Sequence, residues 1–97
     1  MPHCSEFAVF SVIKENQKRV IELSELLFKE MNNEREVLIS HHILRKTDNA
    51  EEICWQLVWL NEEVVAENNK NWSKFPSSAE LESLVGERLY YGHFLLI

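Results

Sequence analysis

The most constraining feature of this 97-residue chain is the stretch Glu52–Leu60, EICWQLVWL, because it is apolar or aromatic at almost every position. Successive side chains of a β-strand point to opposite faces of the sheet, so one face would carry Ile53, Trp55, Leu57 and Trp59. The other face would carry Cys54, Gln56, Val58 and Leu60. Apolar side chains on both faces are typical of a strand that is covered on both sides. We therefore expect this strand to lie in the middle of a sheet.

Three further stretches have apolar residues on both faces and predict three more strands: Phe7–Ile13, Val37–Lys46 and Arg88–Ile97. In the first of them Ser11 is the only polar residue. The turn at residues 47–51 is short and polar, so the strands that flank it would form an antiparallel hairpin.

The segment Gln17–Met31 predicts an amphipathic helix. Spacings of three and four residues place one apolar stripe on it, made of Val20, Leu23, Leu27 and Met31. Asn16 is the expected N-cap, and Asn32–Asn33 is expected to end the helix in a left-handed conformation.

Two helical segments precede the last strand. Asn61 is expected to open a helix that runs to about Trp72, with an inner face made of Val64, Val65, Asn69 and Trp72. The pattern Ser77-x-x-Glu80 predicts a capping box and a short helix that ends near Gly86. Its buried side would be Leu81, Leu84 and Val85.

The resulting order, β-α-β-β-α-β, predicts an α+β fold of the ferredoxin-like class, with one domain over residues 1–97. Right-handed crossovers would place both helical regions on one face of a four-stranded antiparallel sheet. The first strand and Glu52–Leu60 would be its central strands.

The second sheet face has no cover within the chain, although all four strands are apolar on both faces. Such a patch exceeds what monomers usually expose. We therefore predict a homodimer in which the open sheet faces pack together with two-fold symmetry. The alternative is an ordinary two-layer domain with scattered surface apolar residues.

Charge and cysteine content exclude several classes of function. Ten lysines and arginines against sixteen aspartates and glutamates give a net charge of −6, which argues against binding to nucleic acid or to an anionic membrane. Cys4 and Cys54 form no disulfide framework or zinc spacing, so a reducing cytoplasm is the expected location. We expect no signal peptide, and no apolar run approaches the length of a membrane span.

The chain resembles the dimeric α/β-barrel superfamily, in particular its antibiotic biosynthesis monooxygenase-like domains. The resemblance rests on the strand-to-helix junction at residues 56–63, on the segment Asn71–Phe75, on the short helix Ser77–Val85 and on the aromatic last strand. It implies a homodimer with a pocket between sheet and helices in each subunit. Members of this superfamily oxidise aromatic polyketides without metal or flavin, degrade haem, or isomerise small metabolites.

The chain also departs from the patterns of that superfamily. Haem-degrading members use an Asn in the first strand and a His on the helices after the third strand. Here the first strand has Ser11 instead, and no histidine occurs between His42 and His93, so haem degradation is disfavoured. Many members have a Glu immediately before the aromatic residue that ends the third strand, where this chain has Val58.

Candidate site residues follow from side-chain chemistry. A neutral imidazole is a proton acceptor near neutral pH, so His93 or His41 is the candidate base. The candidate substrate-binding residues are Trp55, Trp59, Trp72, Tyr91 and Ser11. The histidines have no recognisable ligand spacing, so we expect no metal. The resemblance implies that no other cofactor is needed.

Two functions remain open at this point. The first is a cofactor-independent monooxygenase-like enzyme that acts on a small aromatic or quinone-type metabolite. The second is a non-catalytic dimeric module that binds a small ligand or a partner. An enzyme needs an internal cavity of about 300 Å³ or more with a polar group that faces into it. If the tryptophans themselves fill that space, the second function is favoured.

Overall fold

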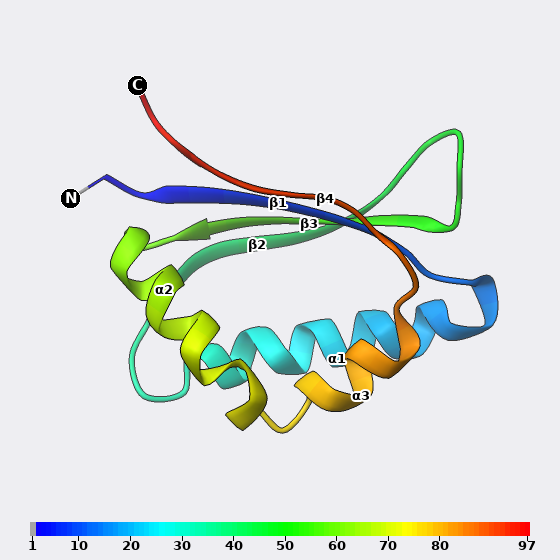
Figure 1. Cartoon of the computed structure of the whole chain (residues 1–97), viewed down its shortest axis with the longest axis horizontal. Coiled ribbons are helices and arrows are strands. Elements are labelled where there is room, and N and C mark those ends of the chain that lie inside the picture. Colours follow the sequence, from blue (N-terminus) through cyan, green and yellow to red (C-terminus); the bar gives the residue numbers. More distant parts are fainter. Residues whose placement is uncertain (1) are drawn as a thin grey trace.

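Helices cover one face of a four-stranded sheet, and the other face is left open (Figure 1). The computed structural model describes residues 2–97. Its elements are β1 (Cys4–Ser11), α1 (Lys14–Met31), β2 (Leu38–Arg45), β3 (Glu52–Trp59), α2 (Glu62–Asn71), the 3₁₀ turn η1 (Trp72–Lys74), α3 (Ser78–Leu84) and β4 (Arg88–Leu95). The strand order is β2-β3-β1-β4, and every neighbouring pair is antiparallel. The predicted ferredoxin-like α+β fold, with the first and third strands in the middle, is confirmed.

Strand β3 supplies one side of the core, as its pattern predicts. Its helix-facing residues Ile53, Trp55, Leu57 and Trp59 are all buried, while the residues between them are half-buried on the open face. The first strand, however, begins at Cys4 rather than Phe7 and ends at Ser11 rather than Ile13. This difference brings Glu6 into the sheet, on the face that the helices cover.

Helix α1 lies along the sheet and buries the predicted stripe of Val20, Leu23, Leu27 and Met31. Both predictions for its ends need correction. The helix begins at Lys14, after Ile13 as N-cap, and Asn16 lies in its first turn, where its amide donates to the Leu84 carbonyl at 3.4 Å. Asn32 ends the helix at φ −93° and so is not left-handed.

The side chain of Asn32 stabilises the connection to β2 instead. Its Oδ1 accepts hydrogen bonds from the backbone N–H groups of Val37 and Leu38, at 3.0 and 2.8 Å.

Helix α2 begins as predicted, because the Asn61 side chain accepts a hydrogen bond from the Val64 N–H at 3.0 Å. Its buried face contains Val64, Val65 and Asn68, whereas Asn69, which the pattern placed inside, is exposed.

The capping box predicted for α3 does not form. Ser77 precedes the helix but makes no capping bond, and both its N–H and its hydroxyl donate to the Glu30 carboxylate of α1. Glu80 pairs with Arg19 of α1 at 2.7 Å. These two contacts attach α3 to α1, and Leu81 is buried beneath them while Leu84 and Val85 are partly buried.

The open face of the sheet carries an apolar patch. Tyr90 and Phe94 of β4 and Leu44 of β2 are 47%, 49% and 44% exposed. On the same face Phe7 and Phe94 meet edge to face, with ring centroids 5.8 Å apart. The Tyr90 side chain lies over Gly92, where an added Cβ would come within 2.8 Å of the Tyr90 hydroxyl and 3.2 Å of its ring. This open-face patch is defined here by Phe7, Leu44, Tyr90 and Phe94.

Among residues 2–97, none of the helices has both the length and the apolar character that crossing a membrane requires.

Candidate functional site

A cavity of about 370 Å³ lies between the sheet and the helices. Strands β1, β3 and β4 form one wall, and the ends of α1 and α2, the turn η1 and helix α3 form the other. Its volume falls within the range of small-molecule sites, about 300–1,000 Å³. The tryptophans therefore surround a space rather than fill it.

Four residues that the sequence predicted as substrate-binding line this cavity: Trp55, Trp59, Trp72 and Tyr91. Trp55 and Trp59 point inward from β3 and are 6% and 1% exposed. Trp72 comes from η1 and Tyr91 from β4, so aromatic rings reach the space from both layers. This arrangement suits a flat aromatic molecule.

Hydrogen bonds fix the three indole rings in place. The Trp55 Nε1–H donates to the Ser24 hydroxyl at 3.1 Å, and the Trp59 Nε1–H donates to Glu6 Oε1 at 3.1 Å. The Trp72 Nε1–H donates to the Glu82 carboxylate. Rings held in this way form a preorganised wall, which lowers the entropic cost of binding a ligand.

The most unusual polar group in the wall of the cavity is the Glu6 carboxylate, which is 4% exposed. Glu6 lies directly opposite His93 in the β1–β4 pair, and its Oε1 is 2.8 Å from His93 Nε2. The same oxygen accepts the Trp59 hydrogen bond, so two groups converge on Oε1. A buried carboxylate requires such partners, because desolvation of an unpaired charge is very costly.

Sequence reasoning missed Glu6 because it began the first strand at Phe7. One signal in the sequence could have revealed it. Glu6 lies two residues before Ala8 and four before Phe10, so all three share one face of the strand. Extending the predicted strand by a single residue would therefore have placed a carboxylate on the same face as two core residues. His93 itself is half-buried beside the cavity and packs edge to face on the Tyr91 ring, with centroids 4.9 Å apart.

The environment of Tyr91 keeps its phenol protonated. Burial raises the pKa of Tyr91 above its ordinary value, and the negative charge of Glu6 raises it further. A hydrogen bond with the Asn69 side chain acts in the opposite direction, and so does the Arg88 guanidinium, which lies 4.9 Å from the centre of the Tyr91 ring. Tyr91 therefore offers a neutral O–H donor at the cavity wall.

The structure places two other predicted residues away from this cavity. His41 lies on β2, where its ring stacks on Phe28 at 4.7 Å and lines a separate surface groove between β2 and α1. Ser11 lies at the end of β1, where its hydroxyl accepts the Glu87 N–H at 2.7 Å. A Cβ added at Gly86 would come within 2.4 Å of that hydroxyl, so Ser11 holds the connection between α3 and β4 at close range.

Other candidate chemistry is restricted. The described residues 2–97 contain no group of three His, Cys, Asp or Glu side chains that could hold a metal ion. Cys4 is buried in the core and Cys54 lies in the open face. Burial raises the pKa of both thiols, which leaves them protonated and poorly nucleophilic near neutral pH.

Comparison with known proteins gives a likeness of fold only. The sequence matches no protein-family model, and no curated protein shows significant similarity to it. Among solved structures, a candidate antibiotic biosynthesis monooxygenase from Chloroflexus aurantiacus superposes with a TM-score of 0.72 at 12% identity, over 98% of this chain and 93% of that chain. Another from Bordetella bronchiseptica gives 0.72 at 11% identity, over 100% and 99%.

A conserved protein of unknown function from Bacteroides thetaiotaomicron, described as a possible oxidoreductase, gives a TM-score of 0.75 at 18% identity, over 98% of both chains. These identities are too low to transfer an activity, but the superposition extends over nearly the full length of each protein. The chain therefore has the same fold as these antibiotic biosynthesis monooxygenase-like proteins.

Proposed function

We propose that the protein is a cofactor-independent monooxygenase-like enzyme that acts on a small aromatic or quinone-type metabolite in the cavity between sheet and helices. The observation that carries the proposal is the buried Glu6–His93 pair in the wall of an aromatic cavity of about 370 Å³. A titratable pair in such a position is a typical feature of functional sites.

Oxygenation without a cofactor requires an electron-rich substrate anion, so the first step is removal of a proton. Glu6 Oε1 already accepts from Trp59 and lies beside His93, which leaves Oε2 as the acceptor for the substrate proton. His93 faces Oε1, where a ring N–H can donate to the carboxylate and hold it in place for the transfer. The candidate base is therefore the Glu6–His93 pair rather than His93 alone, and His41 has no part in this step.

The proposed oxidation needs no reductant other than the substrate itself. When an activated CH₂ group is oxidised to C=O by O₂, the substrate supplies four electrons, one oxygen atom enters the product and the other leaves as water. The Tyr91 O–H, kept neutral by burial and by Glu6, donates to the oxygen on which the anion's charge develops. The indole rings exclude water from the reactive anion.

We also propose that the active form is a homodimer. The open-face patch of Phe7, Leu44, Tyr90 and Phe94 is the surface that a second copy would cover. Each subunit keeps its own cavity, because the cavity lies on the opposite side of the sheet.

A direct test combines ligand binding with oxygen uptake. Flat two- and three-ring phenols that can tautomerise to a ketone with an activated CH₂ group are screened by quenching of tryptophan fluorescence, and the compounds that bind are then assayed for O₂ consumption. Glu6→Gln is expected to keep binding and to lose roughly 10²–10⁴-fold in turnover, the usual contribution of a general base. Glu63→Gln, on the exposed side of α2, is the matched control and should behave as wild type.

Three outcomes are informative. Loss of turnover in Glu6→Gln alone, with EDTA without effect, supports the proposal. Equal turnover in both variants removes Glu6 from the mechanism. Binding without any oxygen uptake supports the second function, a dimeric module that binds a small ligand.

A further inference from the structure

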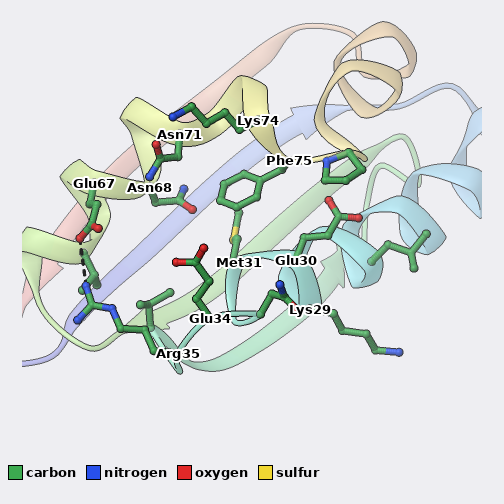
Figure 2. A pocket seen from close by; sticks show the side chains of 15 residues that line it. Lys29, Glu30, Met31, Glu34, Arg35, Glu67, Asn68, Asn71, Lys74 and Phe75 are labelled. Carbon is green, nitrogen blue, oxygen red and sulfur yellow. Dashed lines mark hydrogen bonds and ion pairs between the residues drawn. The ribbon is translucent and has the colours of Figure 1, made fainter.

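A second hollow, an open groove of about 720 Å³, adjoins the cavity, and Figure 2 shows the side chains that line it. It runs between the end of α1, the connection to β2 and the α2–η1 segment. Apolar side chains, among them Val37, Val64 and Phe75, lie along it. Charges of both signs, such as Glu34 and Lys74, lie at its edges, so the groove has no net preference for an anion or a cation.

The groove and the cavity share two residues as a common wall, Met31 and Asn68. These residues are 7% and 8% exposed, so they are well packed where the two spaces meet. Met31 is an unbranched thioether with several rotatable bonds, a side chain that repacks at little cost. A rearrangement of this one side chain is the simplest way to join the two spaces.

Asn68 carries a polar atom without a partner. Its Oδ1 is buried and accepts no hydrogen bond from any residue in the range 2–97. An acceptor that is buried without a hydrogen bond destabilises the folded state. Asn is in addition a residue that disfavours helix interiors. In Figure 2 the amide points from α2 toward Phe75 and Met31, at the boundary between groove and cavity.

We propose that the cavity and the groove form one binding site for an elongated neutral ligand. A flat aromatic head lies in the cavity, an N–H or O–H group beside the head donates to Asn68 Oδ1, and a polar uncharged arm continues past Met31 into the groove. The unpartnered acceptor is then satisfied by the ligand. This inference rests on the proposed function, since it extends the same aromatic site.

A pair of probes isolates the hydrogen bond. Naphthylacetamide has an aromatic head and an amide N–H, whereas its N,N-dimethyl analogue has the same head without a donor. Quenching of tryptophan fluorescence measures both affinities. The wild type is expected to prefer the N–H probe by about tenfold, the value of one buried hydrogen bond. Asn68→Leu is expected to abolish this preference, while Asn68→Asp and the control Glu63→Gln keep it.

A third probe tests the groove. N-Hydroxyethyl naphthylacetamide extends the amide by a polar arm. Asn71→Trp, which fills the groove but does not border the cavity, should weaken binding of this probe about tenfold or more and leave naphthylacetamide unaffected. The midpoint of thermal unfolding of the free Asn68→Leu protein should rise, because an unsatisfied buried polar group is removed.

The results separate this inference from the function on which it rests. If wild type binds both amides equally, or if Asn68→Leu lowers the unfolding midpoint and keeps the preference, the inference is wrong while the aromatic site stands. If no amide probe binds to wild type although phenols quench its fluorescence, the inference is wrong and the proposed function stands. If the phenols do not bind either, the aromatic site is refuted, and the proposed function with it.

Discussion

At the scale of single residues, the proposed chemistry depends on one carboxylate. Glu6 is 4% exposed, lies 2.8 Å from His93 and holds the Trp59 indole, so it connects three strands at the cavity wall. Its charge also acts on Tyr91, whose pKa is raised first by burial and then by Glu6. In the proposed mechanism Glu6 is therefore the proton acceptor and also helps to keep the donor Tyr91 protonated.

The link between Glu6 and Tyr91 gives a prediction about pH. Glu6→Gln removes a negative charge, so the pKa of Tyr91 should fall toward its ordinary value, with the part due to burial retained. The ultraviolet absorbance of the phenolate measures this, with Tyr91→Phe subtracted to remove the contribution of Tyr90. An unchanged Tyr91 titration in Glu6→Gln would show that the two groups do not interact.

The same shift predicts how stability changes at alkaline pH. A raised pKa means that the folded state holds the phenol proton more tightly than the unfolded state does. At neutral pH the phenol is protonated in both states, so its titration does not change the free energy of unfolding there. Its destabilising effect begins as pH rises above the ordinary tyrosine value of about 10. Tyr91→Phe should therefore lose less stability than wild type above that pH, as measured by urea unfolding across the pH range.

At the scale of elements, α2 borders the cavity with a sequence of low helix propensity. It contains three asparagines, one of which, Asn68, is buried. Asparagine disfavours helix interiors, so the helix depends on its N-cap and on burial of Val64 and Val65. The element that carries Asn68 and leads into Trp72 is thus only marginally stable by itself, a common property of segments that move when a ligand binds.

The N-cap of α2 can be tested separately from the site. Asn61→Ala removes the acceptor of the Val64 N–H and should lower the free energy of unfolding by about 1 kcal/mol. Asn61→Asp should retain most of this free energy, because its carboxylate can still accept the hydrogen bond from the Val64 N–H. Asn33→Ala, at an exposed asparagine beyond α1, is the control and should change stability little. Urea unfolding at one fixed protein concentration measures all three; an equal loss in Asn61→Asp would contradict the capping role.

At the scale of the whole molecule, the open face of the sheet remains to be explained. One sheet face packs on three helices, and the other carries the open-face patch of Phe7, Leu44, Tyr90 and Phe94 (Figure 1). A second copy packed on this patch would supply the missing layer, as the sequence predicts.

A charge placed in the open-face patch tests this association. Phe94→Lys should shift the protein from dimer to monomer, because burying an unpaired ammonium between two apolar sheets is very unfavourable. Leu26→Lys, at a similarly exposed apolar residue on α1, should remain dimeric. Sedimentation equilibrium measures the masses. A wild type that is monomeric at high concentration would refute the homodimer.

The sequence by itself determined the order of the elements, the central place of β3, the fact that Trp55 and Trp59 share one face of it, and the N-cap at Asn61. These features depend on alternation, helical spacing and local capping, which the residues express within a few positions of one another. The apolar character of both sheet faces also depends on local alternation. Because the helices of the chain can cover only one face, the sequence also predicted that the other face would be uncovered.

Only the tertiary structure decided which distant groups meet. Glu6 and His93 are 87 positions apart, and the register of β1 against β4 places them opposite each other. The same register and the sheet order separate His41 and Ser11 from the cavity, and the packing of α3 on α1 gives Ser77 the Glu30 carboxylate in place of its capping box. Local pattern cannot specify these contacts, because strand register and helix docking are settled by the burial of the whole core.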